Sequence, residues 1–198
     1  MTTVVPAPPL NVDTSFEDIT TEICTRVNDP LKDTYGERAE SLFVQAVCEL
    51  AIETPIEEIQ ELVVDIASSD VVFANHEASV DITKGTLKVI DVFIEPEELV
   101  TSKLILKAVD HDDIKRMNLE PAYKPAGNEC FWYRAGNTIR FLLSNDWDGS
   151  DELNFTIQSI FSPDKTKWTG SMIDSHGYSR GFLYRCIDNA VAKLRAEL

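Results

Sequence analysis

The chain has 198 residues, of which 43% are hydrophobic and 9% aromatic, and its 34 acidic and 18 basic residues give a formal net charge of -16. This composition is typical of a folded globular protein, and the length suits one sizeable core or two small modules. Because so negative a surface repels a phosphate backbone, we do not expect tight binding to DNA or RNA.

The first residues, MTTVVPAPPLNVD, hold three prolines and lack the basic region and apolar core of a signal peptide. We therefore expect a flexible arm over residues 1–13. No run approaches the roughly 20 apolar residues of a membrane-spanning helix, so no membrane partner is expected. The 4 cysteines include no C-x-x-C pair, and we interpret them as buried thiols in a reducing compartment.

Three Thr-x-x-Glu patterns, which are typical of helix starts, precede amphipathic segments. They begin at Thr14, Thr34 and Thr54, and Pro55 takes the first helical position, where its missing N–H costs nothing. Apolar residues then recur at helical spacing. The sequence therefore predicts three amphipathic helices within residues 14–70, the last of them starting at Pro55.

The third predicted helix carries an acidic face formed by Glu57, Glu58, Glu61 and Asp65. Negative charge is concentrated in this part of the chain, because residues 1–70 hold 15 acids and 3 bases. The simplest interpretation is solubility. A sharper one is a surface that lies near nucleic acid without binding it.

From Val71 the pattern changes to β-branched residues in alternation, which predicts strands. Turn signals such as Lys84-Gly85 and Gly136-Asn137 separate the runs. A short helix is predicted over residues 110–117, before Pro121. The strand-like runs are VVFAN, ASVDITKG, TLKVIDVFI, SKLILKAV, FWYRAG, NTIRFLLS and LNFTIQSIFS.

The last segment returns to helical spacing, with Asp174 or Ser175 as the expected N-cap. We predict an α+β fold in which this C-terminal helix, within residues 169–198, completes a helical bundle with the helices of residues 14–70. A small antiparallel β-rich insertion occupies residues 71–168. The apolar stripe of the C-terminal helix is Tyr178, Phe182, Leu183, Ile187, Val191 and Leu194.

The segment DWDGSDE, residues 146–152, resembles a calcium loop only superficially. Counted from Asp146, the sixth position is Asp151 instead of glycine and the twelfth is Ile157 instead of the bidentate glutamate. Asp148-Gly149 is a strong turn pair between two apolar runs. We therefore predict a hairpin turn in preference to an ion site.

No motif for catalysis or cofactor binding stands out. His76, His111 and His176 are scattered, without the spacing of a metal or nucleophile site. The 8 glycines form neither a dinucleotide-binding nor a P-loop pattern. We therefore expect no cofactor, no metal and no enzymatic activity, and infer a protein that works by contact.

Three motifs, NDPLKDTYGERAESLFVQAVCELA, GNTIRFLLSNDWDGSDELNFTI and GFLYRCIDNAVAKL, lie before, within and after the β-rich part. Their order resembles that of head-to-tail adaptor (connector) proteins of tailed bacteriophages, over most of residues 15–198. The chain departs from the family's tyrosine-aspartate-leucine-proline signature, because residues 86–91 read TLKVID.

The resemblance implies a structural subunit of a homo-oligomeric, dodecameric ring in the virion neck, assembled in the host cytoplasm between the portal protein and tail or neck proteins. DNA passes through such a ring without specific binding. A negative channel lining would suit this passage, because it retains a polyanion weakly. The channel-lining residues would be Glu57, Glu58, Glu61 and Asp65.

The resemblance also implies two contact regions. In the family the C-terminal segment commonly docks onto the portal, and we expect the acidic hairpin to face the tail. The portal-facing residues would be Arg180, Phe182, Arg185, Lys193, Leu194 and Arg195. The tail-facing residues would be Asp146, Trp147, Asp148 and Asp151.

Two other classes of protein remain open. One is a tail-completion or tube-capping protein of the neck, which is usually built around a β-sandwich with fewer helices. The other is an acidic metal-dependent enzyme whose site would be assembled from distant residues, namely Asp112, Asp113, Asp148 and Asp151.

Overall fold

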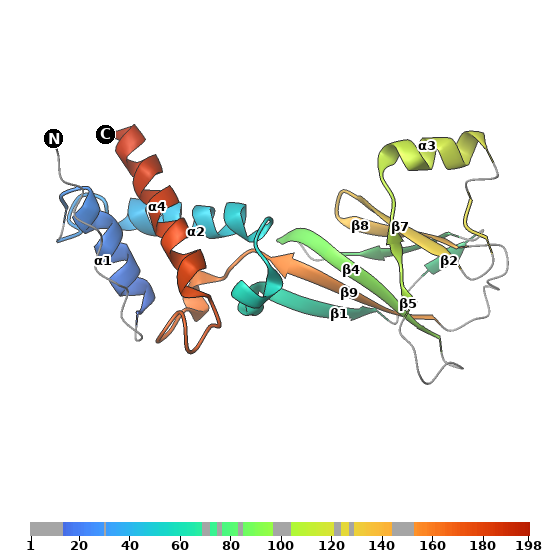
Figure 1. Cartoon of the computed structure of the whole chain (residues 1–198), viewed down its shortest axis with the longest axis horizontal. Helices are drawn as coiled ribbons and strands as arrows, with labels where there is room; N and C mark the ends of the chain where they lie inside the picture. The colour runs from blue at the N-terminus through green and yellow to red at the C-terminus, as the bar shows by residue number, and fades with distance from the viewer. Residues whose placement is uncertain are drawn as a thin grey trace. The chain divides into compact units, whose positions relative to one another are not determined.

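The computed structural model describes residues 14–29, 31–68, 72–74, 77–82, 85–96, 104–120, 124–126, 129–143 and 153–198. These residues form four α-helices and two β-sheets, so the fold is mixed and compatible with the expected α+β class (Figure 1). The chain divides into two compact units. We call them the helical unit, Met1–Val63 with Ser162–Leu198, and the β unit, Val64–Phe161.

Three helices, α1 (Phe16–Arg26), α2 (Gly36–Ala51) and α4 (Arg180–Glu197), belong to the helical unit. α4 packs against both α1 and α2, so segments far apart in the sequence share one interior (Figure 1). Short 3₁₀ turns lie at Ile56–Glu58 (η1), Gln60–Leu62 (η2) and Lys165–Lys167 (η4).

The apolar stripes predicted for these helices are buried, and aromatic rings link them. Trp168 lies edge-on to Phe16 at 5.0 Å between ring centroids, and Tyr178 stacks on Phe182 at 5.8 Å. Fully burying one such side chain contributes about 1.5–3 kcal/mol to stability. Residues with no exposed surface include Ile19, Ile23, Phe43, Phe182, Leu183 and Ile187.

Two helix starts differ from the predicted capping residues. Ser15, not Thr14, caps α1, where the Asp18 amide donates to Ser15 Oγ at 3.1 Å and the Ser15 amide donates to Asp18 Oδ2 at 3.0 Å. The Thr34 cap of α2 is also wrong. The Asp29 carboxylate accepts the Thr34 amide instead, at 3.2 Å, and no side chain caps α2.

α4 begins later than predicted. Ser179, not Asp174 or Ser175, is its N-cap and accepts the Phe182 amide at 3.0 Å. Gly177 has φ +64°, which lies in the left-handed region and cannot continue a right-handed helix. The helix can therefore start only beyond Gly177.

The helix predicted from Pro55 is wrong. Only the two short turns η1 and η2 follow this proline, and the chain then continues as strand β1 (Val63–Ser68). The β-branched residues Val63, Val64 and Ile66 favour an extended strand. Pairing within a sheet therefore prevails over the helical spacing of the apolar residues.

The β unit contains two sheets. The first has the strand order β1-β9-β4-β5, where β9 is Leu153–Phe161, β4 is Thr86–Pro96 and β5 is Leu104–Ile105. The second has the order β2-β3-β8-β7-β6. β6 and β7 pair in parallel, whereas β7 with β8 and β3 with β8 are antiparallel. These strands are Val72–Ala74 (β2), Glu77–Asp81 (β3), Lys107–Ala108 (β6), Cys130–Ala135 (β7) and Thr138–Leu143 (β8).

The two sheets share one apolar core. Phe141 on β8 stacks on Phe155 on β9, with ring centroids 4.2 Å apart. Alternate residues of each strand point into this core, as expected of half-buried strands. Its members include Val80, Val92, Trp132, Ile139, Phe141, Phe155 and Ile157.

The run SKLILKAV, predicted as one strand, divides at Leu106 into β5 and β6, which belong to different sheets. The Leu106 amide donates to the Val92 carbonyl of the first sheet at 2.8 Å. Its carbonyl accepts Trp132 Nε1 of the second sheet at 3.1 Å. Leu106 therefore ties the two sheets together.

Helix α3 (His111–Leu119) lies where the sequence predicts a short helix, on the face of the second sheet that points away from the shared core. Asp110 caps it by accepting two backbone N–H groups, at 2.9 and 2.8 Å. Met117 packs against Phe131 of β7. This packing holds α3 against the β7–β8 pair.

The limits of the β unit differ from residues 71–168. It begins at Val64 because the predicted third helix is partly a strand, and it ends at Phe161. Residues 1–13 and the acidic segment 146–152, with Asp146, Trp147, Asp148 and Asp151, lie outside the described residues. Among the described helices, none combines the length and hydropathy needed to cross a membrane.

Candidate interaction surfaces

The basic side chains of α4 are largely engaged within the helical unit. Arg185 Nη2 lies 3.1 Å from Glu58 Oε2. Lys193 Nζ lies 2.6 Å from Glu49 Oε2, and Arg195 Nη2 donates to a backbone carbonyl of α1 at 2.7 Å. These contacts attach α4 to η1, α2 and α1, so the basic residues predicted to face the portal are partly neutralised by the chain itself.

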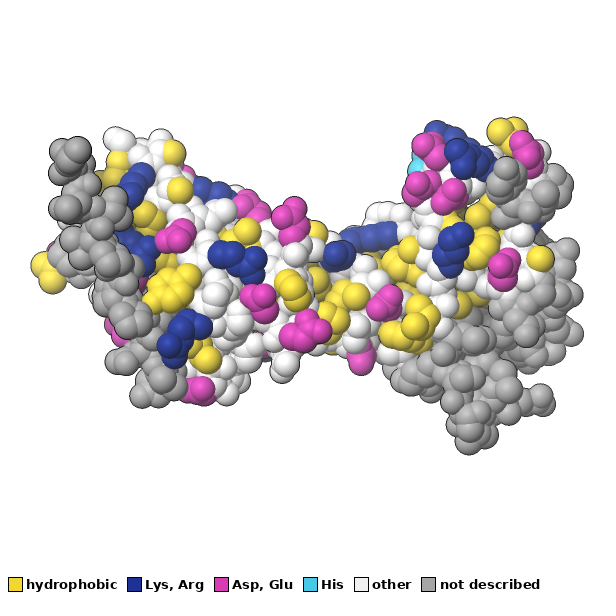
Figure 2. Space-filling view, viewed as in Figure 1, with side chains coloured by type: hydrophobic (Ala, Val, Ile, Leu, Met, Phe, Trp, Pro, Cys, Tyr) yellow, Lys and Arg dark blue, Asp and Glu magenta, His cyan; other side chains and the backbone are white. Residues whose placement is uncertain are grey.

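Two residues predicted to face a portal are buried. Phe182 and Leu194 are 0% and 1% exposed, so a partner cannot touch their side chains unless the helical unit unfolds. Arg180, the first residue of α4, is exposed and has no partner among the described residues. On the drawn face of the helical unit, acidic and basic side chains alternate without a continuous patch of one sign (Figure 2).

The acids Glu57, Glu58, Glu61 and Asp65 do not share one helical face, because this segment forms η1, η2 and β1. Glu57 is exposed. Glu58 Oε2 also accepts the hydroxyl of Ser179 at 2.8 Å. Asp65 accepts a side-chain N–H from β9 at 3.2 Å. Glu58 and Glu61 therefore serve structural contacts, whereas Glu57 and Asp65 are exposed.

A half-buried polar cluster, which no sequence spacing indicated, joins η2 to the loop before α4. His176 Nδ1 lies 3.0 Å from Glu61 Oε1, and its Nε2 lies 3.1 Å from the Thr169 carbonyl. Tyr178, two residues after His176 in the sequence, is 1% exposed. Burial, and then the charge of Glu61, raise the pKa of Tyr178. The phenol therefore stays neutral beside the carboxylate.

The acids named for the metal-dependent enzyme alternative make other contacts where the structure describes them. Asp113 completes the cap of α3 by accepting a backbone amide at 3.4 Å, and Asp112 pairs with Lys115 at 3.3 Å. Asp148 and Asp151 lie outside the described residues. Within the ranges that the structure describes, no group of three or more His, Cys, Asp or Glu side chains could hold a metal ion.

The 4 cysteines are free thiols; Cys24, Cys130 and Cys186 are buried and Cys48 is half-buried. Burial raises the pKa of Cys130 and of Cys186 to about 12. Burial is also the main cause that raises the pKa of Cys24 and Cys48. Because the thiolate is the nucleophile and metal ligand, these thiols are poorly suited to either role.

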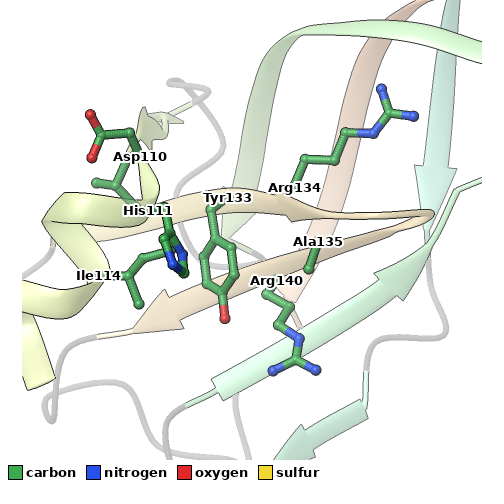
Figure 3. Close-up of a pocket in the computed structure, with 8 residues that line it drawn as sticks. Asp110, His111, Ile114, Tyr133, Arg134, Ala135 and Arg140 are labelled. Atoms are coloured by element: carbon green, nitrogen blue, oxygen red, sulfur yellow. The ribbon is translucent and has the colours of Figure 1, made fainter.

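A cavity of about 480 Å³ lies beside the start of α3, against the second sheet. Tyr133 and Arg140 line it as directly opposed residues of the β7–β8 pair. His111 and Ile114 of α3 point toward Tyr133, and the Arg140 side chain extends in the same direction as the phenol (Figure 3). The cavity thus combines an apolar wall with three hydrogen-bonding side chains.

Arg134 also lines this cavity, but its guanidinium points away from Tyr133 (Figure 3). It donates to the carbonyls of Gly136, Leu87 and Thr86 at 2.9, 3.2 and 3.0 Å. Arg134 therefore links the β7–β8 hairpin to β4 of the first sheet, with its guanidinium held away from Tyr133.

No protein-family model matches the chain, and no curated protein matches it either.

Proposed function

We propose that the chain is a structural subunit of the neck of a tailed bacteriophage, a head-to-tail adaptor that forms a homo-oligomeric ring between the portal protein and the tail machinery. The observation that carries this proposal is the nested order of the chain. A contiguous β unit, Val64–Phe161, lies between two segments that pack together as one helical unit. The same order underlies the resemblance of the sequence motifs to adaptor proteins.

In this proposal α1, α2 and α4 form the bundle of the adaptor, and the β unit is its inserted antiparallel domain. Contacts such as Arg185 with Glu58 and Lys193 with Glu49 use the polar side chains of α4 to hold its position. A subunit that works by shape needs such fixed geometry more than it needs reactive groups. The dodecameric ring would pass DNA without specific binding, helped by a formal charge of -16 on each copy.

The portal contact can be tested at Arg180, the exposed cation at the start of α4. Deleting residues 180–198 would remove core residues and unfold the helical unit, so a point substitution is the sharper test. We expect the wild-type chain to form a ring-sized complex with its cognate portal in native mass spectrometry. Arg180→Glu should weaken that complex by about tenfold or more.

Lys167→Glu is the matched control, because Lys167 is an exposed cation of the same unit, with a side chain that is 75% exposed. It should bind the portal as the wild type does. Equal portal binding by Arg180→Glu and Lys167→Glu would remove α4 from the portal contact. A wild-type chain that neither forms rings nor binds the portal would contradict the adaptor proposal as a whole.

A second candidate, the tail-completion protein of the neck, is favoured by one observation. The β unit has two sheets around one core, which is the architecture expected of that class. Native mass spectrometry of the chain mixed with the portal and, separately, with the tail tube distinguishes the two candidates. Binding to the tail tube without binding to the portal would favour the tail-completion protein.

A further inference from the structure

The cavity beside α3 is lined by two arginines, which differ in their contacts. Arg140 lines this cavity, is exposed, and has no partner among the described residues. Arg134 in the same lining donates to three carbonyls, and Lys115 on α3 pairs with Asp112. A guanidinium with free donors is suited to bind a carboxylate, with which it can form two parallel hydrogen bonds.

The rest of the lining favours such a ligand. Tyr133, directly opposite Arg140, offers a hydroxyl, and His111 offers a ring nitrogen from α3. Val109, which is buried, and Ile114 form an apolar wall. An apolar wall lowers the local dielectric constant, so a charge pair formed against it is stronger than one on an open surface.

Asp110 is the one acid in the lining, and its position does not oppose an anion strongly. Its carboxylate accepts two backbone N–H groups at the start of α3, and it points away from Tyr133 and Arg140 (Figure 3). The cavity therefore has a cationic end, at Arg140, which lies apart from the acidic cap of the helix.

The charge of the β unit selects among anions. Residues 64–161 hold 17 acids and 9 bases. The field of such a unit repels a polyanion such as nucleic acid along its whole length, whereas a single carboxylate interacts mainly with the groups nearest to it. The class of ligand that fits is therefore one carboxylate on a stem that reaches the apolar wall.

We propose that this cavity receives an acidic side chain from a second copy of the chain. This inference rests on the proposed ring and names one of the contacts that would hold it together. Each copy carries 34 acids and 18 bases, so acids outnumber the cations that could pair with them within one copy. Seating an acid of one copy in the cavity of the next joins two different surfaces, and such heterologous contacts generate a ring where the rotation between copies closes.

The test compares three substitutions by sedimentation velocity and native mass spectrometry, with and without the cognate portal. Arg140→Gln removes the charge, and Arg140→Glu reverses it. Arg116→Glu makes the same reversal at an exposed residue of α3 outside the cavity lining. We expect Arg140→Gln to raise the dissociation constant between subunits by about tenfold or more, and Arg140→Glu to leave monomers. Arg116→Glu should assemble as the wild type does.

A ring of wild-type stability in Arg140→Glu would overturn this inference and leave the adaptor proposal standing. Equal loss of assembly in Arg116→Glu would also overturn it, because the effect would then come from net charge. A wild-type chain that never forms a ring would overturn both.

Circular dichroism checks that each variant is folded. If the Arg140 variants do not fold, Tyr133→Phe replaces them. This substitution removes one hydroxyl from the lining and should weaken assembly by about threefold. Unchanged assembly by Tyr133→Phe would overturn the inference.

Discussion

The imidazole of His176 lies between two acceptors, with Nδ1 at 3.0 Å from Glu61 Oε1 and Nε2 at 3.1 Å from the Thr169 carbonyl. The contact with Glu61 ties η2 to the loop that precedes α4. The contact with Thr169 lies within this loop and fixes the orientation of the imidazole.

Removing this bond should destabilise the helical unit. The side chains of His176 and Glu61 are only 11% and 27% exposed, and a hydrogen bond to a charged group contributes about 1.5–3 kcal/mol. We expect His176→Phe to lower the free energy of unfolding by about that amount in urea titrations. His111→Phe, at an exposed position, should change it by less than about 0.5 kcal/mol. Equal effects of the two substitutions would contradict the interpretation.

The cap of α1 should make stability depend on pH in acid. Hydrogen bonds from Ser15, the backbone one first, hold the pKa of Asp18 below its ordinary value of 3.8. A carboxyl with a lowered pKa stabilises the fold above its unfolded value, and this contribution is lost as the pH falls through the folded value. Asp18→Asn should therefore cost about 0.3–1 kcal/mol at pH 7.

The difference between wild type and Asp18→Asn should shrink as the pH falls well below 3.8, because both side chains are then neutral. Urea titrations at neutral and acidic pH measure it. Asp33→Asn is the control, since Asp33 is exposed and takes no part in a cap. A difference that persists unchanged in acid would show that the carboxylate charge is not its source.

The turn between β7 and β8 depends on the conformation of Gly136. Its φ is +66°, and a Cβ built there would meet no atom within 4 Å. The cost of Gly136→Ala is thus one of backbone conformation alone, about 1–2 kcal/mol. Gly181→Ala, in the first turn of α4 and without positive φ, should instead be neutral or stabilising by up to about 1 kcal/mol. Thermal denaturation measures both effects: Gly136→Ala should lower the melting temperature, and Gly181→Ala should leave it unchanged or raise it.

The thiols should be slow to react while the protein is folded. Because burial raises the pKa of Cys130 and Cys186 to about 12, little thiolate exists at pH 8. Iodoacetamide at pH 8 should label all 4 cysteines in urea but label the native chain far more slowly. Cys48 should react first because it is only half-buried. Rapid labelling of Cys130 in the native chain would contradict this prediction.

Much of the fold could be predicted from periodicity, because apolar spacing reports burial directly. The stripe that includes Phe182, Ile187 and Leu194 is buried as expected. The helix expected from Pro55 is wrong, and Thr54, its expected cap, has another role: its hydroxyl donates to a carbonyl at the end of α2, at 2.7 Å. A capping box and a helix end can share the same residues, and the local sequence does not distinguish them.

The candidate surfaces were harder to predict than the fold. Charged residues of α4 were expected to face a partner, but the sequence does not show that Arg185 meets Glu58 across 127 positions. Tyr133 and Arg140 are opposed only because the turn at Gly136 fixes the register of β7 and β8. Such contacts depend on tertiary packing, which the spacing of residues within one helix or strand does not predict.

The placement of α4 also sets an order of events on the ribosome. The β unit is one uninterrupted stretch, so all of it is synthesised before α4 exists. α1 and α2 meanwhile leave the exit tunnel with the apolar faces that α4 will later cover, Phe43 among them. The β unit is therefore complete before the helical unit is. The helices α1 and α2, although synthesised first, can pack with α4 only after the whole β unit has been made. A premature stop codon after Phe161 would leave a finished β unit attached to helices that have no means of covering their apolar sides.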